Sequence, residues 1–165
     1  MTAGERGTAT HLVMQYLSLE GDPKETVRSL VERRLLTEEQ GSCVNIPALK
    51  AFLASPLAQT LRRANRIERE YRFSLLAEAG EYYIDMAEGE KVLLQGVVDL
   101  FAETEEGIIV VDFKTDRVDG GEVLERAEQY RPQITAYSTA LERITGKKVF
   151  RRVLYFLTAG QEVDV

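Results

Sequence analysis

The spacing of apolar residues changes along the chain, and the change lies near residue 65. Before it, apolar side chains recur every three to four residues, a period that buries one face of a helix. Such stretches predict four helices, and Pro56 directly after Ser55 is a typical helix start. The predicted helices cover residues 12–17, 24–36, 47–54 and 56–64, with 41–45 as a linker. Thr8 or Thr10 would cap the first helix and place His11 in its first turn.

After residue 65 the chain alternates between strand and helix patterns. Runs rich in β-branched and aromatic residues predict strands, with a last edge strand in the tail. A helical period between residues 122 and 145 predicts a helix, and Pro132 predicts a break or kink within it. The strand order around this helix predicts a mixed α/β sheet with helices on its faces. The predicted strands are 69–73, 96–102, 108–114, 149–157 and part of 158–165, with a further turn and strand pair over 75–85 and 88–94.

The segment from residue 96 to 116 reads as a β-hairpin that carries charge on one face. If its loop is residues 104–107, Glu103 pairs with Ile108, and the same register sets Asp99 opposite Asp112. Directly opposed residues share a face, with Cβ atoms roughly 5 Å apart. Because strand side chains alternate, Lys114 lies on the same face as Asp112.

This arrangement of charges predicts a metal site. Two carboxylates at such a short distance repel each other unless one is protonated or a cation lies between them. Oxygen ligands suit Mg²⁺, with Mn²⁺ as an alternative, and the Lys114 ammonium would orient a metal-bound water. Together, Asp99, Asp112 and Lys114 outline a site for phosphodiester hydrolysis. The alternative is a solvated charged edge without chemistry.

Composition narrows the possible classes of protein. A chain of 165 residues with 44% hydrophobic residues suits one globular domain. The single cysteine, Cys43, excludes an internal disulfide framework and a four-cysteine iron–sulfur cluster. No apolar signal region or bilayer-spanning segment is present, so we expect a cytoplasmic protein without a membrane partner. The net charge of −6 argues against free-standing affinity for nucleic acid, so a nucleic-acid substrate would follow a narrow local path or be delivered by another domain.

Five arginines between residues 62 and 72 form the densest basic stretch of this acidic chain. Such a run is usually a solvated face, and the alternative is a stripe that binds phosphates along the path of the DNA. The sequence leaves both readings open for this set: Arg62, Arg63, Arg66, Arg69 and Arg72.

The residues of the hairpin also resemble a known family. An Asp on one strand followed by Asp-x-Lys on the next is the pattern of the PD-(D/E)xK nuclease superfamily. GVVDL and VVDFKTD, together with GTATH, REYRF and YRPQITAY, resemble the C-terminal nuclease domains of the AddA and RecB helicase–nucleases in the family's order. The resemblance covers nearly the whole chain. It implies the restriction-endonuclease-like fold, with a mostly helical part over 1–64 and the catalytic sheet and helices over 65–165.

The resemblance also implies roles for further residues. His11 of GTATH would be a metal ligand beside Asp99 and Asp112, and Glu70 of REYRF a carboxylate near the metal. Within YRPQITAY, Gln133, Tyr137 and Tyr130 would support the site and contact the DNA backbone. For each there is a plainer reading, since a lone histidine is often a surface residue and tyrosines are often core aromatics.

Taken together, the resemblance implies a Mg²⁺-dependent DNA exonuclease domain. It would act in double-strand-break processing for recombinational repair, as part of an AddA chain that pairs with an AddB subunit. No phosphate-binding loop for ATP is present in these residues, so helicase activity would belong to the rest of such a chain. Two alternatives remain open: a stand-alone exonuclease of the same fold, and an inactive module that only binds DNA or a partner subunit.

Overall fold

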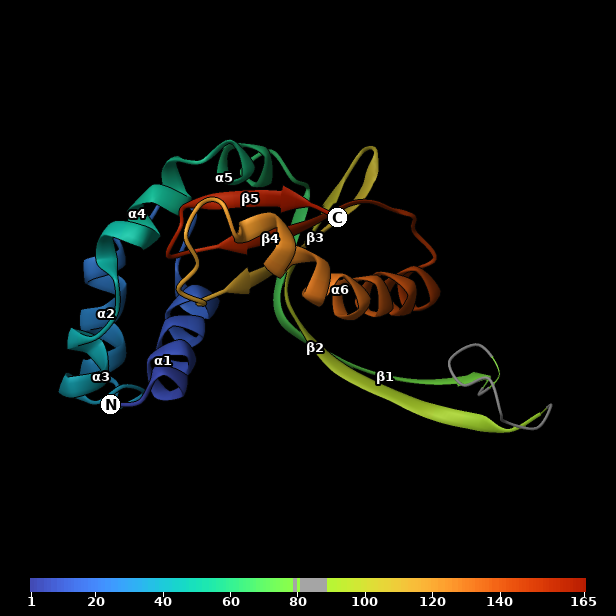
Figure 1. Cartoon of the computed structure of the whole chain (residues 1–165), viewed down its shortest axis with the longest axis horizontal. Helices are drawn as coiled ribbons and strands as arrows, with labels where there is room; N and C mark the ends of the chain where they lie inside the picture. Colours follow the sequence, from blue (N-terminus) through green and yellow to red (C-terminus); the bar gives the residue numbers. More distant parts are fainter. Residues whose placement is uncertain (79, 81–88) are drawn as a thin grey trace.

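The computed structural model describes residues 1–78, 80 and 89–165, and its centre is a mixed five-stranded sheet (Figure 1). The strands lie in the order β1-β2-β3-β4-β5, with β3 and β4 parallel and the other neighbours antiparallel. The predicted α/β class is therefore confirmed. The strands are β1 Arg66–Glu78, β2 Lys91–Thr104, β3 Gly107–Lys114, β4 Val149–Phe156 and β5 Gln161–Asp164, and the last confirms the predicted edge strand of the tail.

Helices precede the sheet and connect its parallel strands. Within the described residues five helices come before β1, not four, because the predicted linker at 41–45 is partly helical. The helices are α1 Ala3–Tyr16, α2 Pro23–Glu32, α3 Glu38–Ser42, α4 Ile46–Ala54, α5 Pro56–Leu61 and α6 Val123–Thr145. No helix of the described part is long and apolar enough to cross a bilayer.

The first helix begins earlier than predicted, and this moves His11 along it. Thr2 caps α1 in a reciprocal box, where its hydroxyl accepts from the Glu5 N–H and the Glu5 carboxylate accepts from the Thr2 N–H. His11 consequently lies in the third turn and not in the first. The expectation of a first-turn histidine was wrong because the apolar period begins well after the cap.

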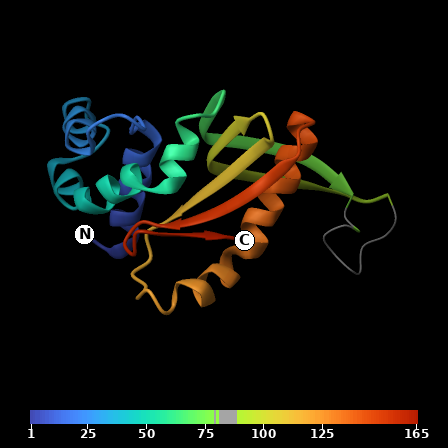
Figure 2. The same ribbon diagram turned by 90° about the horizontal axis from the view of Figure 1, so that it is seen from above.

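Two clusters of buried apolar residues flank the sheet, and Figure 2 shows α6 and the N-terminal helices on its two sides. Alternate residues of β3 divide between them: Ile109, Val111 and Phe113 pack with α1, α4 and α5, whereas Ile108 and Val110 pack with α6. This is the alternation predicted for the strand. Asp112 and Lys114 continue the α6-facing side of β3 at its end, so charged side chains lie on this face just beyond the apolar ones.

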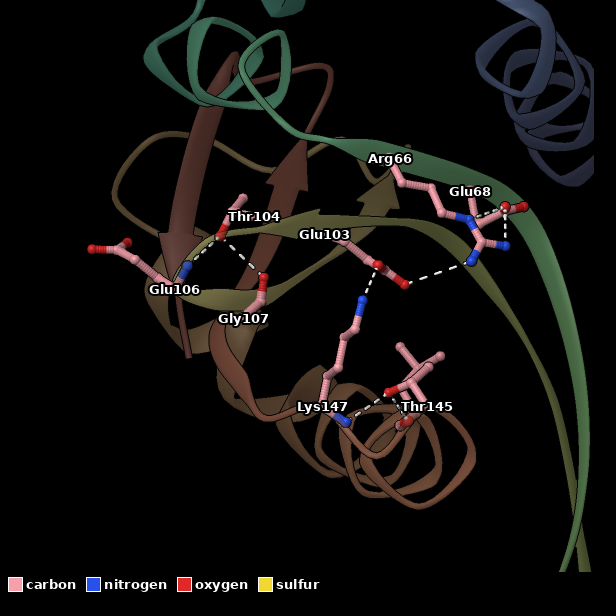
Figure 3. Close-up of polar contacts among 9 residues, drawn as sticks. Arg66, Glu68, Glu103, Thr104, Glu106, Gly107, Thr145 and Lys147 are labelled. Atoms are coloured by element: carbon pink, nitrogen blue, oxygen red, sulfur yellow. Dashed lines mark hydrogen bonds and ion pairs between the residues drawn. The ribbon is translucent and has the colours of Figure 1, made fainter.

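The hairpin between β2 and β3 has the predicted register and a shorter turn. Glu103 pairs with Ile108, and Thr104 pairs with Gly107, so the turn is residues 105–106 and not the four residues 104–107. Gly107 has φ of 130° and is the residue type that tolerates this conformation. Glu103 is held between the side chains of Arg66 and Lys147, which fastens the turn to the end of α6 (Figure 3).

One further prediction is confirmed in its described part and another is corrected. The strand pair predicted over 75–85 and 88–94 is present where it is described, from Leu75 paired with Leu94 to Glu78 paired with Lys91, and it extends the sheet as a two-stranded arm (Figure 1). Residues 79 and 81–88, where the second turn was predicted, lie outside the described residues. Helix α6 continues through Pro132, because residues on both sides of it, Ala127 and Ile134, are buried in the same core.

Candidate functional site

The site forms where β2 separates from β3. The backbone ladder of these strands ends at Leu100 and Val111, one position before Asp99 and Asp112. The Phe113 N–H instead donates to Oδ2 of Asp99, at 2.8 Å. The Asp99 carboxylate thus replaces a ladder bond and lies in the opening between the strands, where it reaches α1. The prediction that Asp99 pairs directly opposite Asp112 is therefore wrong, because the ladder opens one position before these residues.

Three candidate metal ligands meet at this opening. Single ligand atoms of His11, Glu70 and Asp99 all lie within 4.8 Å of one another, and His11 Nδ1 is 3.6 Å from Asp99 Oδ2. The three come from α1, β1 and β2, so only the tertiary fold unites them. The two carboxylates suit Mn²⁺ or Mg²⁺, and an imidazole beside them is acceptable for either ion, although it is unusual for Mg²⁺.

Glu70 reaches this position through an unusual backbone conformation. Its φ is 49°, in the left-handed region, and the β1–β2 ladder passes from Arg69 to Tyr71 without pairing it. Such a conformation costs a non-glycine residue about 1–2 kcal/mol. Because strain of this kind persists where the surrounding structure imposes it, it supports a functional role for Glu70.

Asp112 lies beside this group and contacts a cation of its own chain. It is only 5% exposed, and its Oδ2 is 2.6 Å from Lys114 Nζ. Within the described residues this oxygen has no hydrogen-bond partner, and the ion pair with Lys114 is its polar contact. A buried carboxylate oxygen held only by an ion pair is suited to accept a further cation.

Burial and the neighbouring acid make the ionised form of Asp99 unfavourable. Burial, and secondly the negative charge of Asp112, raise the pKa of Asp99 to about 6, while His11 opposes the change. Crowded carboxylates of this kind are stabilised when a divalent cation joins them. The residues present therefore fit a metal ion such as Mg²⁺.

The Lys114 ammonium is positioned by residues of α6. It donates to Gln133 Oε1 at 3.0 Å, and Gln133 Nε2 donates to the Tyr137 hydroxyl at 2.9 Å. The ammonium also lies 3.8 Å from the centre of the Tyr130 ring, within range of a cation–π contact. Helix α6 thus fixes the direction of the lysine side chain.

A second chain of contacts leads away from Tyr130. Its hydroxyl donates to Asp116 Oδ2 at 2.6 Å, and Arg126 Nε lies 3.8 Å from the same oxygen. Burial, followed by the hydrogen bond to Asp116, raises the pKa of Tyr130 to about 12, so the phenol stays protonated and donating at neutral pH. The sequence had assigned no role to Asp116, although it lies in VVDFKTD.

The structure brings all of the predicted site residues into this one region, and it shows how two glycines make room for them. A Cβ on Gly96 would lie 2.8 Å from the Phe73 ring and 2.9 Å from the Tyr137 ring. A Cβ on Gly7 would lie 3.0 Å from Thr115 Oγ1. Gly96 opens GVVDL and Gly7 opens GTATH, so their place in the motifs was the available signal.

Three arginines of the basic stretch have structural partners. Arg62 donates to the carbonyls of Leu19 and Leu53. Arg69 donates to the Met14 carbonyl, which ties β1 to α1. Arg66 pairs with Glu68 and Glu103 (Figure 3). These three arginines therefore have structural contacts: Arg62 within the helical part, Arg69 between β1 and α1, and Arg66 between β1 and β2.

Comparison with known proteins gives matches over nearly the whole chain. The family model described as "PD-(D/E)XK nuclease superfamily" matches residues 1–164. Three relatives are named as subunits of an "ATP-dependent helicase/nuclease": that of Thermoanaerobacter sp. (strain X514) is 40% identical over 99% of this chain, that of Bacillus velezensis 40% over 97%, and that of Acetivibrio thermocellus 39% over 98%. The chain spans only 13–14% of the length of these relatives.

Proposed function

Because this chain belongs to the PD-(D/E)XK nuclease superfamily, we propose that it is a metal-dependent DNA exonuclease domain that uses Mg²⁺. The observation that carries the proposal is the meeting of His11, Glu70 and Asp99 beside the Asp112–Lys114 ion pair. An imidazole, buried acids and an amine in one opening are the groups that hydrolysis of a phosphodiester requires.

The proposed roles follow from the contacts. His11, Asp99 and Asp112 would hold the ion with Glu70 as a further carboxylate ligand, a role supported by the proximity of Glu70 to His11 and Asp99. A bound Mg²⁺ supplies Lewis-acid stabilisation of charge on the scissile phosphate. The Lys114 ammonium would orient the attacking water. Its ion pair with Asp112 and its hydrogen bond to Gln133 fix the position of the ammonium.

Gln133 and Tyr137 would contact the DNA strand. Gln133 is exposed and lies on the same face of α6 as Tyr137, one turn away. An amide binds a phosphate oxygen without any dependence on its own titration. Tyr130 would act indirectly, through its ring under the Lys114 ammonium.

We further propose that these residues are one nuclease domain of a longer helicase–nuclease. The relatives that carry this name are about seven times as long as the chain. In such a protein the remaining AddA segments and an AddB subunit would deliver one strand of a DNA end to this site during recombinational repair in the cytoplasm. The acidic net charge of −6 agrees with delivery by other domains.

The test is cleavage of labelled single-stranded DNA by this chain in Mg²⁺ or in EDTA, beside Asp112→Asn and the exposed-turn control Glu106→Gln. We expect cleavage only with Mg²⁺, a loss of about 100-fold or more in Asp112→Asn, and wild-type rates in the control. Binding without cleavage in any metal would replace this proposal with that of an inactive DNA-binding module.

A further inference from the structure

A cleft of about 720 Å³ lies on the α1 side of the candidate site, next to the residues proposed to act in hydrolysis. Its walls are the N-terminal half of α1, the start of α4, the loop after β3 and the first turn of α6. In Figures 1 and 2, α1 and the loop that leaves the end of β3 lie side by side. This volume is in the range of clefts that enclose small organic ligands.

The cleft collects positive charge in an acidic protein. Three guanidinium groups line it, those of Arg6, Arg117 and Arg126, against the single carboxylate of Asp116. Arg126 lies 3.8 Å from Asp116, and Arg6 donates to the Met1 carbonyl. Arg117 is exposed and makes no hydrogen bond or ion pair with the described part of the chain. Its five donors are available to an incoming anion.

The cleft adjoins the candidate metal ligands through His11. This residue lines the cleft, and its Nδ1 lies 3.6 Å from Asp99. Gly7 and Thr115 also line the cleft, and the missing Cβ of Gly7 lets α1 approach the loop that carries Arg117. If one phosphate of a DNA strand lies at the candidate metal ligands, the next part of that strand lies beside this cleft.

We propose that the cleft is a second phosphate subsite, in which Arg117 contacts a backbone phosphate next to the scissile one on a single DNA strand. Guanidinium groups bind phosphate oxygens in a fork geometry, and the hydroxyls of Thr115 and Thr158 in the same walls add neutral donors. Such contacts position the strand without reading its bases. The inference rests on the proposed function only in taking a DNA strand as the ligand.

The test is the salt dependence of binding, measured without cleavage. A 5′-fluorescein-labelled oligothymidylate is titrated with the chain in EDTA by fluorescence anisotropy, at several NaCl concentrations. Each lost phosphate contact lowers the slope of log K against log salt by about 0.7 for a single strand. We therefore expect the slope of Arg117→Gln to be about 0.7 smaller than that of the wild type, which is about a 2.6-fold smaller loss of affinity between 50 and 200 mM salt.

Arg28→Gln is the matched control. Arg28 is an exposed arginine on α2, paired with Glu25, and its replacement changes the net charge equally. A reduced slope in Arg117→Gln with a wild-type slope in Arg28→Gln supports the subsite. Equal slopes in all three proteins, equal reductions in both variants, or no binding by the wild type would each overturn it.

Cleavage in Mg²⁺ separates this inference from the proposed function. If the wild type cleaves DNA and Arg117→Gln has an unchanged binding slope, the subsite fails and the nuclease proposal stands. If neither protein cleaves but the slope difference is present, the subsite stands as part of a binding module. In an active enzyme we expect Arg117→Gln to raise KM and leave kcat nearly unchanged, because it contacts the strand away from the reacting atoms.

Discussion

At the residue scale, the candidate site stores unfavourable interactions that a cation would relieve. Asp99 is buried near Asp112, with its pKa raised to about 6, and Glu70 holds a φ of 49°. Neither feature stabilises the metal-free fold. Both place carboxylate oxygens in the opening between β2 and β3, so function and stability oppose each other at these residues.

Replacement of Asp99 by asparagine is expected to stabilise the metal-free protein in a pH-dependent manner. Its pKa is raised from 3.8 to about 6, so the native state binds the proton more tightly than the unfolded state, and the ionised carboxylate costs stability as pH rises between these values. Asp99→Asn should therefore match the wild type near pH 4 and exceed it above pH 6, by up to about 3 kcal/mol.

Urea unfolding in EDTA between pH 4 and 8 measures this difference. Asparagine retains an oxygen that can accept the Phe113 N–H, so the backbone contact is preserved. Glu106→Gln, in the exposed turn, controls for the loss of one negative charge. An Asp99→Asn variant less stable than the wild type at pH 8 would contradict the assignment of Asp99 as a destabilising buried acid.

Glycine at position 70 is expected to relieve backbone strain at the expense of metal binding. The left-handed conformation costs a non-glycine residue about 1–2 kcal/mol. Glycine avoids this cost but loses more conformational entropy on folding, so Glu70→Gly should increase the free energy of unfolding by up to about 1 kcal/mol. Arg34, with φ of 58°, is the matched control. Both glycine variants should resist urea better, and only Glu70→Gly should bind Mn²⁺ more weakly by calorimetry. Equal Mn²⁺ affinities would remove Glu70 from the ligand set.

At the scale of elements, the site depends on how closely α1 and α6 approach the strands. Helix α6 contacts the arm of β1 and β2 through Tyr137, whose ring meets Phe73 edge-on at 5.8 Å. Gly96 is the point on β2 over which these rings meet. Tyr137 is hydrogen-bonded to Gln133, and Gln133 to Lys114, so the packing of the Tyr137 ring affects the position of the Lys114 ammonium.

Gly96→Ala is accordingly expected to destabilise the fold and disturb the site. A Cβ there would lie under 3.0 Å from two aromatic rings, and overpacking of this kind costs about 1–3 kcal/mol. Gly121→Ala is the control, because nothing lies within 4 Å of its added Cβ. Thermal unfolding compares the two variants, and a Gly96→Ala protein as stable as Gly121→Ala would show that the rings move aside freely.

At the scale of the whole molecule, the sheet separates two cores, and the site lies where that sheet opens. The five N-terminal helices hold His11 against one face, while α6 holds Lys114 through Gln133 at the other. A bound ion would link α1, β1 and β2 through His11, Glu70 and Asp99. Metal binding should therefore stabilise the entire fold.

Addition of Mg²⁺ is expected to raise the melting temperature of the wild-type chain. At ten times its Kd, an ion that binds only the native state adds about 1.4 kcal/mol, which corresponds to about 3–5 °C for a domain of this size. The increase should vanish in Asp99→Asn, and sodium chloride of the same ionic strength should not reproduce it in the wild type. The same increase in Asp99→Asn would place the bound Mg²⁺ elsewhere.

The local pattern of the sequence was sufficient for the class of fold and for the strand that carries Asp112 and Lys114. Alternation with period two predicts which side of β3 is charged, and it depends only on neighbouring residues. The register of the hairpin followed from its apolar flanks, although the turn is shorter than predicted. The motifs also named His11 and Glu70, through resemblance and not through any physical rule that links residues so far apart.

Only the tertiary structure decided how these groups meet. The opening between β2 and β3, the left-handed backbone of Glu70 and the cleft lined by Arg117 have no signature in local periodicity. Each arises from packing between elements distant in sequence, such as the approach of α1 to the loop after β3 at Gly7. Hydrophobic patterning specifies which face of an element is buried, whereas the positions of its polar atoms depend on which element it is buried against.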